Sequence, residues 1–136
     1  MEVLSPMNVN HIGMVVSSLS RSRDLYVAEF GYEVKVDNLF VENQDVNITM
    51  LRNMMGGPDL ELITPVSADS PSASALKRRL VLNHIGYETK NYEEVLAKFE
   101  SKIVRPSMPA PHELFNGGRT FFAFINGSLT EFVELL

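Results

Sequence analysis

The alternation of apolar and polar residues predicts a strand followed by a helix near the start of the chain. Residues 8–16 are apolar enough for a β-strand. Residues 19–30 then place apolar side chains at helical spacing, and Gly31 ends the helix. The residues expected to face inward from this helix are Leu25, Tyr26 and Phe30.

The same order of elements returns in the second half. Residues 82–88 read as a strand, and Asn91 is placed to begin a helix, with Glu94 completing a variant of the capping box. The inward residues of this helix would be Val95, Leu96 and Phe99. Each half therefore opens with a strand and a helix.

Extended segments follow each helix. Their composition is typical of strands, and three are expected in each half. The segments are 32–37, 46–51 and 60–64, then 103–105, 119–125 and 131–136. The pattern predicts an α+β fold made of two tandem βαβββ modules.

The segments between these elements complete the predicted organisation. Ser70 and Pro71 resemble a helix start, so a short linker helix is expected over about 70–80. Residues 106–118 read as a long irregular loop, either a lid or a surface connection. We expect one domain over residues 1–136, with module one at about 8–65 and module two at about 82–136.

A repeat supports the two modules. Asn-His-Ile-Gly begins at Asn10 and again 73 residues later at Asn83. The same offset carries Glu61, within Leu-Glu-Leu, onto Glu134, within Val-Glu-Leu. Duplication explains both matches, so each half has a histidine and a glutamate at one spacing.

Strand geometry predicts where these four side chains point. Successive side chains alternate between the faces of a strand, so each residue of the set lies opposite to its apolar neighbours. If those neighbours face the helices, the four polar groups line one concave face of a curved mixed sheet, around a metal-binding cleft. The four residues are His11, Glu61, His84 and Glu134.

Two imidazoles and two carboxylates suit one divalent metal ion. Carboxylates within apolar strands are costly to bury unless they are paired or bind a metal. The set fits Co, Mn, Ni, Zn, Fe or Mg, and leaves positions open for substrate oxygens. Glu131, three residues from Glu134, is the nearest rival and breaks the offset, whereas His112 is interpreted as a surface residue.

Composition narrows the functional classes. The 12 basic and 17 acidic residues give a net charge of −5, which opposes a general role on nucleic acid or an anionic membrane. With no cysteine, a metal must use nitrogen and oxygen ligands. No stretch approaches the roughly 18 apolar residues of a membrane span, so a cytoplasmic protein is expected.

The chain resembles the vicinal oxygen chelate (glyoxalase/bleomycin resistance) superfamily over essentially its whole length. Within that superfamily it is most similar to methylmalonyl-CoA epimerases. The segments that carry the resemblance are 60–65 (Leu-Glu-Leu-Ile-Thr-Pro), 69–71 (Asp-Ser-Pro), His84, 117–119 (Gly-Gly-Arg) and 132–135 (Phe-Val-Glu-Leu).

The resemblance implies a metal-dependent epimerase or isomerase that removes a proton next to a carbonyl, with an acyl-CoA substrate. Glu134 would be the base and Glu61 its partner on the opposite face of the substrate. A lactoylglutathione-lyase-like isomerase acting on a thiol conjugate, a small-molecule-binding protein of the resistance type and a dioxygenase are the alternatives. A homodimer is expected from open sheet edges and from the resemblance.

Two segments depart from the epimerase pattern. Residues 125–128 (Ile-Asn-Gly-Ser) replace a His-Pro-Lys type segment, and near residues 46–50 only Asn47 stands where some epimerases have an additional acidic residue. Met50, Met54 and Met55 are interpreted as core filling or as a flexible apolar wall for an acyl group.

Overall fold

The computed structural model describes residues 5–136, which divide into two compact units. The N-terminal unit comprises residues 11–83, and the C-terminal unit comprises residues 84–136 together with the segment that ends at Asn10. Each unit contains one βαβββ module, in which a helix packs on a mixed sheet. The α+β class and the two tandem modules are therefore confirmed.

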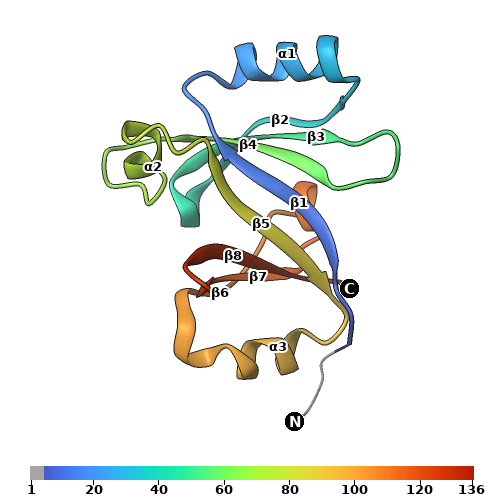
Figure 1. The fold of residues 1–136 in the computed structure, drawn as a ribbon, viewed down its shortest axis with the longest axis vertical. Helices are drawn as coiled ribbons and strands as arrows, with labels where there is room; N and C mark the ends of the chain where they lie inside the picture. Colours follow the sequence, from blue (N-terminus) through green and yellow to red (C-terminus); the bar gives the residue numbers. More distant parts are fainter. Residues whose placement is uncertain (1–4) are drawn as a thin grey trace. The chain divides into compact units, whose positions relative to one another are not determined.

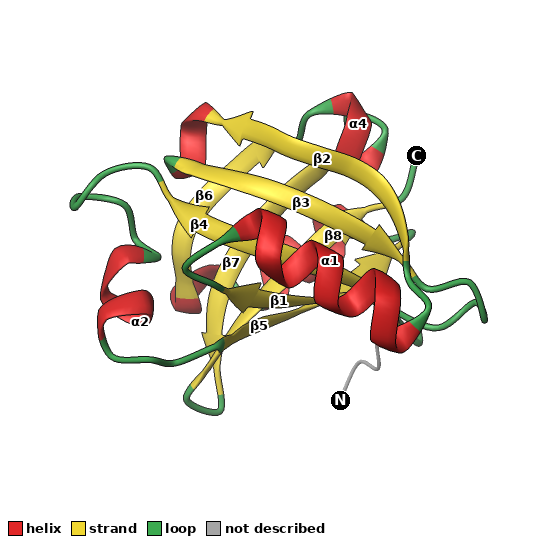
Figure 2. Cartoon of the chain, turned by 90° about the horizontal axis from the view of Figure 1, so that it is seen from above, coloured by secondary structure: helices red, strands yellow, loops and turns green. Residues whose placement is uncertain are grey.

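The N-terminal module has the strand order β2-β3-β4-β1, with β1 parallel to β4 and the other neighbours antiparallel. Helix α1 covers one face of this sheet, and α2 follows β4 (Figures 1 and 2). The elements are β1 (Asn8–Val15), α1 (Leu19–Phe30), β2 (Glu33–Val41), a 3-10 turn (Glu42–Gln44), β3 (Val46–Arg52), β4 (Asp59–Pro65) and α2 (Ala73–Lys77).

The core of this module lies between α1 and the sheet. Leu51, Leu60 and Leu62 are buried there and pack against Tyr26 of the helix, as the helical spacing predicts. The prediction for two other helix residues is wrong, because Leu25 is 51% exposed and Phe30 is 66% exposed. Gly31 ends the helix as expected, with a left-handed φ of 77° that glycine adopts readily.

The C-terminal module repeats the plan with the order β5-β8-β7-β6 and a parallel pair β5–β8. Helix α3 covers one face of its sheet (Figure 1). The elements are β5 (Leu82–Thr89), α3 (Tyr92–Lys98), a 3-10 turn (Glu100–Lys102), β6 (Ile103–Pro109), α4 (His112–Phe115), β7 (Arg119–Ile125) and β8 (Ser128–Glu134).

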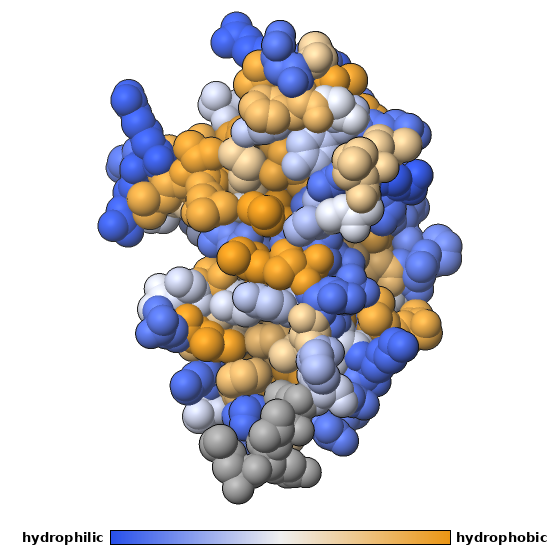
Figure 3. Space-filling model, turned by 45° about the vertical axis from the view of Figure 1, so that its right-hand side comes forward, coloured by the Kyte–Doolittle hydropathy of each residue, from blue (hydrophilic) through white to orange (hydrophobic). Residues whose placement is uncertain are grey.

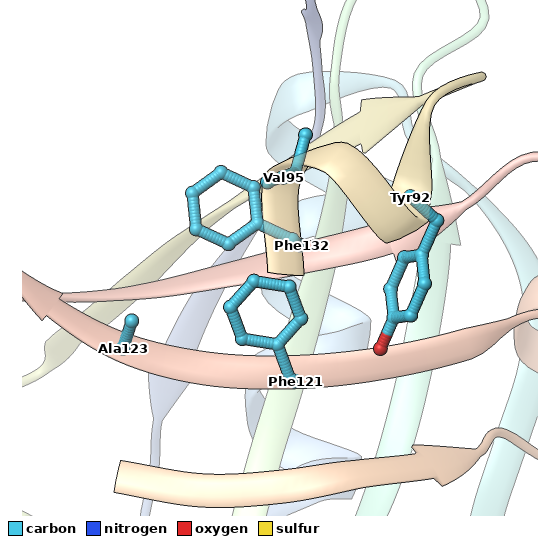
Figure 4. Packing of buried hydrophobic residues seen from close by; sticks show 5 residues of the cluster. All are labelled: Tyr92, Val95, Phe121, Ala123 and Phe132. Atoms are coloured by element: carbon cyan, nitrogen blue, oxygen red, sulfur yellow. The ribbon is translucent and has the colours of Figure 1, made fainter. Parts of the chain in front are cut away.

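Aromatic rings fill the core under α3. Phe121 of β7 and Phe132 of β8 stack with their centroids 4.9 Å apart, and Tyr92 and Val95 of the helix cover them (Figure 4). Phe121 and Phe132 therefore identify the helix-facing side of these two strands.

Three local predictions need correction. Asn91 is the N-cap of α3, but its side chain makes no capping hydrogen bond, so the capping box does not form. The linker helix begins after Ser72 rather than at Ser70. The segment 106–118 is not one irregular loop, because β6 continues to Pro109 and α4 follows it.

Candidate functional site

A histidine and a glutamate meet on neighbouring strands of the N-terminal module. Ile12 of β1 and Leu60 of β4 belong to the core under α1. His11 directly precedes Ile12, and Glu61 directly follows Leu60, so both side chains face away from the helix. Both are buried, with exposed fractions of 0% and 3%. Nε2 of His11 lies 3.9 Å from Oε2 of Glu61.

The C-terminal module contains the matching pair. His84 of β5 and Glu131 of β8 are 4% and 1% exposed, and Nε2 of His84 lies 3.1 Å from Oε1 of Glu131. The ring of Phe122 meets the imidazole of His84 edge-on, with centroids 5.2 Å apart. Because Phe132 faces α3, Glu131 faces the other side of the sheet.

The pairing register shows that the two pairs are equivalent. In the parallel pair β1–β4 Glu61 lies beside Gly13, and in the parallel pair β5–β8 Glu131 lies beside Gly86. Each histidine stands two residues before that glycine, on the same face of its strand. The modules therefore present a buried His–carboxylate pair at corresponding positions.

Glu134 lies elsewhere in its module. Like Phe132 it is on the helix side of β8, where its Oε1 accepts a hydrogen bond of 2.9 Å from the backbone N–H of Arg119 and its Oε2 accepts one of 2.8 Å from the guanidinium. The same guanidinium forms an ion pair of 2.6 Å with Glu93 of α3 and lies over the ring of Tyr92. These hydrogen bonds from Arg119 lower the pKa of Glu134 below its usual range.

The structure thus separates the four residues that the sequence pattern groups. His11, Glu61 and His84 each belong to a buried pair, but the glutamate beside His84 is Glu131 and not Glu134. The pattern misplaces Glu134 because it takes Val133 as helix-facing, whereas Phe132 occupies that side. The aromatic residue at 132 was the signal in the sequence that could have revealed the correct face.

These residues form a donor set that fits a metal ion. Of the described residues, His11, Glu61, His84 and Glu131 are a buried group that could hold one. A buried carboxylate loses its hydration, and only a partner such as a cation or a hydrogen-bond donor offsets that cost. Two imidazoles and two carboxylates supply nitrogen and oxygen ligands of the kind that divalent transition metals and Mg²⁺ accept.

The face of the N-terminal module around Glu61 is apolar. Met50 lies directly across from Glu61, and Ile48 lies across from Ile63, all of them buried. Asn47 pairs with Thr64 and is on the opposite side of β3. Strand β3 therefore brings no acidic or amide side chain to the face of Glu61.

The methionines and the remaining histidine have different environments. Met50 is 1% exposed, which agrees with an apolar wall, while Met54 and Met55 are 57% and 93% exposed and fill no core. His112 is exposed at the start of α4, as expected for a surface residue.

Comparison with known proteins gives a family match. The model of the glyoxalase/bleomycin resistance protein/dioxygenase superfamily matches residues 10–124. The uncharacterized protein YqjC of Bacillus subtilis (strain 168) is 31% identical over 132 residues, covering 93% of this chain and 91% of that protein.

Solved structures of similar fold include methylmalonyl-CoA epimerases. The enzyme from Mycobacterium tuberculosis has a TM-score of 0.85 at 18% identity, covering 100% of this chain and 93% of that one. A variant of the Streptomyces coelicolor enzyme, in complex with 2-nitronate-propionyl-CoA, has a TM-score of 0.80 at 25% identity, covering 96% and 99%.

Proposed function

Because the chain belongs to the glyoxalase/bleomycin resistance protein/dioxygenase superfamily, we propose that it is a divalent-metal-dependent enzyme that removes a proton next to a carbonyl group. The observation that carries the proposal is the pair of equivalent, buried His–Glu pairs, one in each module. Each buried carboxylate has an imidazole beside it, and a metal ion bound by both groups would offset the hydration that the carboxylate loses on burial.

His11, Glu61, His84 and Glu131 are the proposed ligands of one metal ion, with Glu131 in place of the Glu134 that the sequence pattern favours. When bound, the metal would stabilise negative charge on the substrate's carbonyl oxygen. The choice among Co, Mn, Ni, Zn, Fe and Mg is a matter for elemental analysis.

Glu131 and Glu61 are the proposed proton-transfer groups. A carboxylate takes the α-proton, the electron pair of the broken C–H bond moves onto the carbonyl as an enolate, and return of a proton to the carbon completes the exchange. Glu134 is a poorer base for this step, since the hydrogen bonds from Arg119 lower its pKa and hold both carboxylate oxygens.

A short-chain acyl-CoA is the proposed substrate class. Support comes from the fold likeness to methylmalonyl-CoA epimerases and from the buried apolar residues Ile48, Met50 and Ile63 beside Glu61, which suit a short acyl chain. A cytoplasmic location belongs to the same proposal.

The experiment is α-proton exchange of methylmalonyl-CoA in D₂O with metal-loaded protein. We expect deuterium incorporation that Glu131→Gln abolishes and that Glu134→Gln, the matched control three residues away, retains. Loss with Glu134→Gln alone would reverse the assignment of the base. Absence of exchange in the wild-type protein would overturn the proposed reaction.

The apolar face of β3 favours a second candidate. Since Ile48 and Met50 occupy that strand's positions on the side of Glu61, proton return from one direction lacks an acid from β3. The alternatives are a lactoylglutathione-lyase-like isomerisation and binding without catalysis, and both can be tested with the same protein preparation. Formation of S-lactoylglutathione from methylglyoxal and glutathione, without exchange of methylmalonyl-CoA, would favour the isomerase.

A further inference from the structure

Arg105 of β6 lies on the same face of the C-terminal module as His84 and Glu131. In the antiparallel ladder Arg105 is opposite Phe122, and Phe122 is opposite Glu131. Directly opposed residues share a face of a sheet, so these three side chains form one row across β6, β7 and β8. Phe122 also contacts the ring of His84.

An irregularity of β6 creates this placement. Ile103 pairs with Ala123 and packs in the core under α3, so regular alternation would send Arg105 to the helix side as well. Instead the register shifts between Ile103 and Arg105, and it shifts again between Arg105 and Met108. A bulge reorients side chains in this way. Strand β6 returns to the helix side at Ser107, whose hydroxyl lies 2.6 Å from the hydroxyl of Tyr92.

The guanidinium of Arg105 lies over an aromatic ring, and its anionic neighbour among residues 5–136 is Glu131. Its Cζ lies 4.8 Å from the centroid of Phe122, and the charge of Glu131 attracts it. Arg105 is partly buried, and this burial lowers its pKa. A partly desolvated cation on the same face as the His84–Glu131 pair is suited to bind an anion.

We propose that Arg105 binds a carboxylate of the substrate and thereby selects an acyl thioester that bears a second, anionic carboxyl group. This inference rests on the proposed function and adds to it the residue that recognises the free carboxylate of the substrate. The planar guanidinium offers two parallel N–H donors to a carboxylate, and its Cζ lies over the ring of Phe122. Arg105 is a specificity residue in this role, and the proton-transfer groups stay Glu131 and Glu61.

The test compares two ligands that differ by one carboxyl group, methylmalonyl-CoA and propionyl-CoA, by calorimetric titration of metal-loaded protein. Charge-assisted hydrogen bonds are worth enough that wild-type protein should bind methylmalonyl-CoA about tenfold or more tightly than propionyl-CoA. Arg105→Met, which keeps an apolar stem, should bind the two ligands about equally, with the loss confined to methylmalonyl-CoA.

Two further variants serve as controls for the role of Arg105. Arg105→Lys retains the charge but not the forked donors, so its preference should be intermediate. Arg21→Met removes an exposed arginine of α1 and should match wild type. Full discrimination by Arg105→Met, or no discrimination by wild-type protein, would overturn the proposal.

The binding measurement tests the role of Arg105, and the proton-exchange measurement tests the proposed reaction, so one proposal can fail without the other. Discrimination that depends on Arg105, without exchange in D₂O, would reject the proposed reaction and keep Arg105 as a carboxylate receptor. Exchange that proceeds while Arg105→Met retains its discrimination would reject the role of Arg105 alone.

Discussion

Two glutamates three residues apart on β8 have opposite environments. Glu131 is buried beside a histidine on the face away from α3, whereas Glu134 is held by an arginine on the helix side. Alternation along the strand produces the difference, because an odd separation places two residues on opposite faces. The chemistry of each carboxylate therefore follows from its face and not from its neighbours in sequence.

Glu134 should contribute to stability in a pH-dependent way. Arg119 lowers its folded-state pKa below the unfolded value of 4.5, so the contribution is present above that value and is lost as the pH falls through the folded pKa. We expect Glu134→Gln to be less stable than wild type at pH 7 and to approach wild type below about pH 4. Urea unfolding at several pH values measures this, and a difference that grows on acidification would contradict it.

A divalent metal should stabilise the protein through His84. A ligand that binds only the folded state at 1,000 times its dissociation constant adds about 4 kcal/mol to the free energy of unfolding. The increment measured with and without Co²⁺ should be large in wild type and in the exposed-residue control His112→Ala, and it should largely vanish in His84→Ala. An equal increment in all three proteins would exclude His84 as a ligand.

At the scale of elements, period-two alternation was sufficient to predict much of the site. It placed His11 and Glu61 away from α1 because Ile12, Leu60 and Leu62 pack under that helix. On β5 the residue that packs under α3 is Tyr87, three residues after His84, whereas Ile85 is exposed. The two βαβββ modules could be predicted because the same order of strand, helix and turn signals occurs in each half of the sequence. Local pattern was enough wherever a strand is regular and its core side is plainly apolar.

The position of the second glutamate and the face of Arg105 could not be predicted, because they depend on the lengths of connections and on bulges, which local sequence pattern does not encode. Gly13 lies beside Glu61 and Gly86 beside Glu131, so the connection in the second module is three residues shorter and the offset of 73 no longer holds at β8. The match between Glu61 and Glu134 at that offset is a coincidence of short Glu-containing segments. Bulges such as those beside Arg105 likewise depend on pairing with a distant strand.

The turn before β7 should tolerate no side chain at Gly118. A Cβ there would collide with the backbone carbonyl oxygen of Glu134 and crowd that of Phe115 at 3.1 Å. Gly118→Ala should lower the free energy of unfolding by about 1–3 kcal/mol, as overpacking does. Gly57→Ala is the matched control, since its Cβ would meet only the flexible side chain of Asn53. Equal urea midpoints for both variants would contradict the prediction.

At the scale of the whole molecule, each unit has its own core, and considerable apolar surface is exposed as well (Figure 3). Strand β2 is an edge strand, and Phe40 on it is 52% exposed. No helix among the described residues has the length and apolar character needed to cross a membrane. Exposed apolar side chains on an edge strand are typical of surfaces that associate.

Association should take the form of a homodimer. Most oligomers of identical chains are closed twofold assemblies, which present the same surface from each partner. Light scattering at tens of micromolar should give twice the chain mass of 15.3 kDa, and Phe40→Lys on the β2 edge should shift the mass toward the monomer. A wild-type mass of one chain would contradict the prediction.

The irregular pairing of β6 has a consequence for how this scaffold can diverge. Arg105 faces away from α3 because the pairing of β6 holds one extra residue after Ile103, so a further residue inserted between Ile103 and Arg105, with the bulge kept, would turn the arginine to the side of α3 without any change in its identity. A single-codon insertion at this point of the edge strand would thus move a positive charge from one face of the sheet to the other. Among related proteins, the length of β6 would then decide which face of the sheet has the positive charge, independently of the residue types.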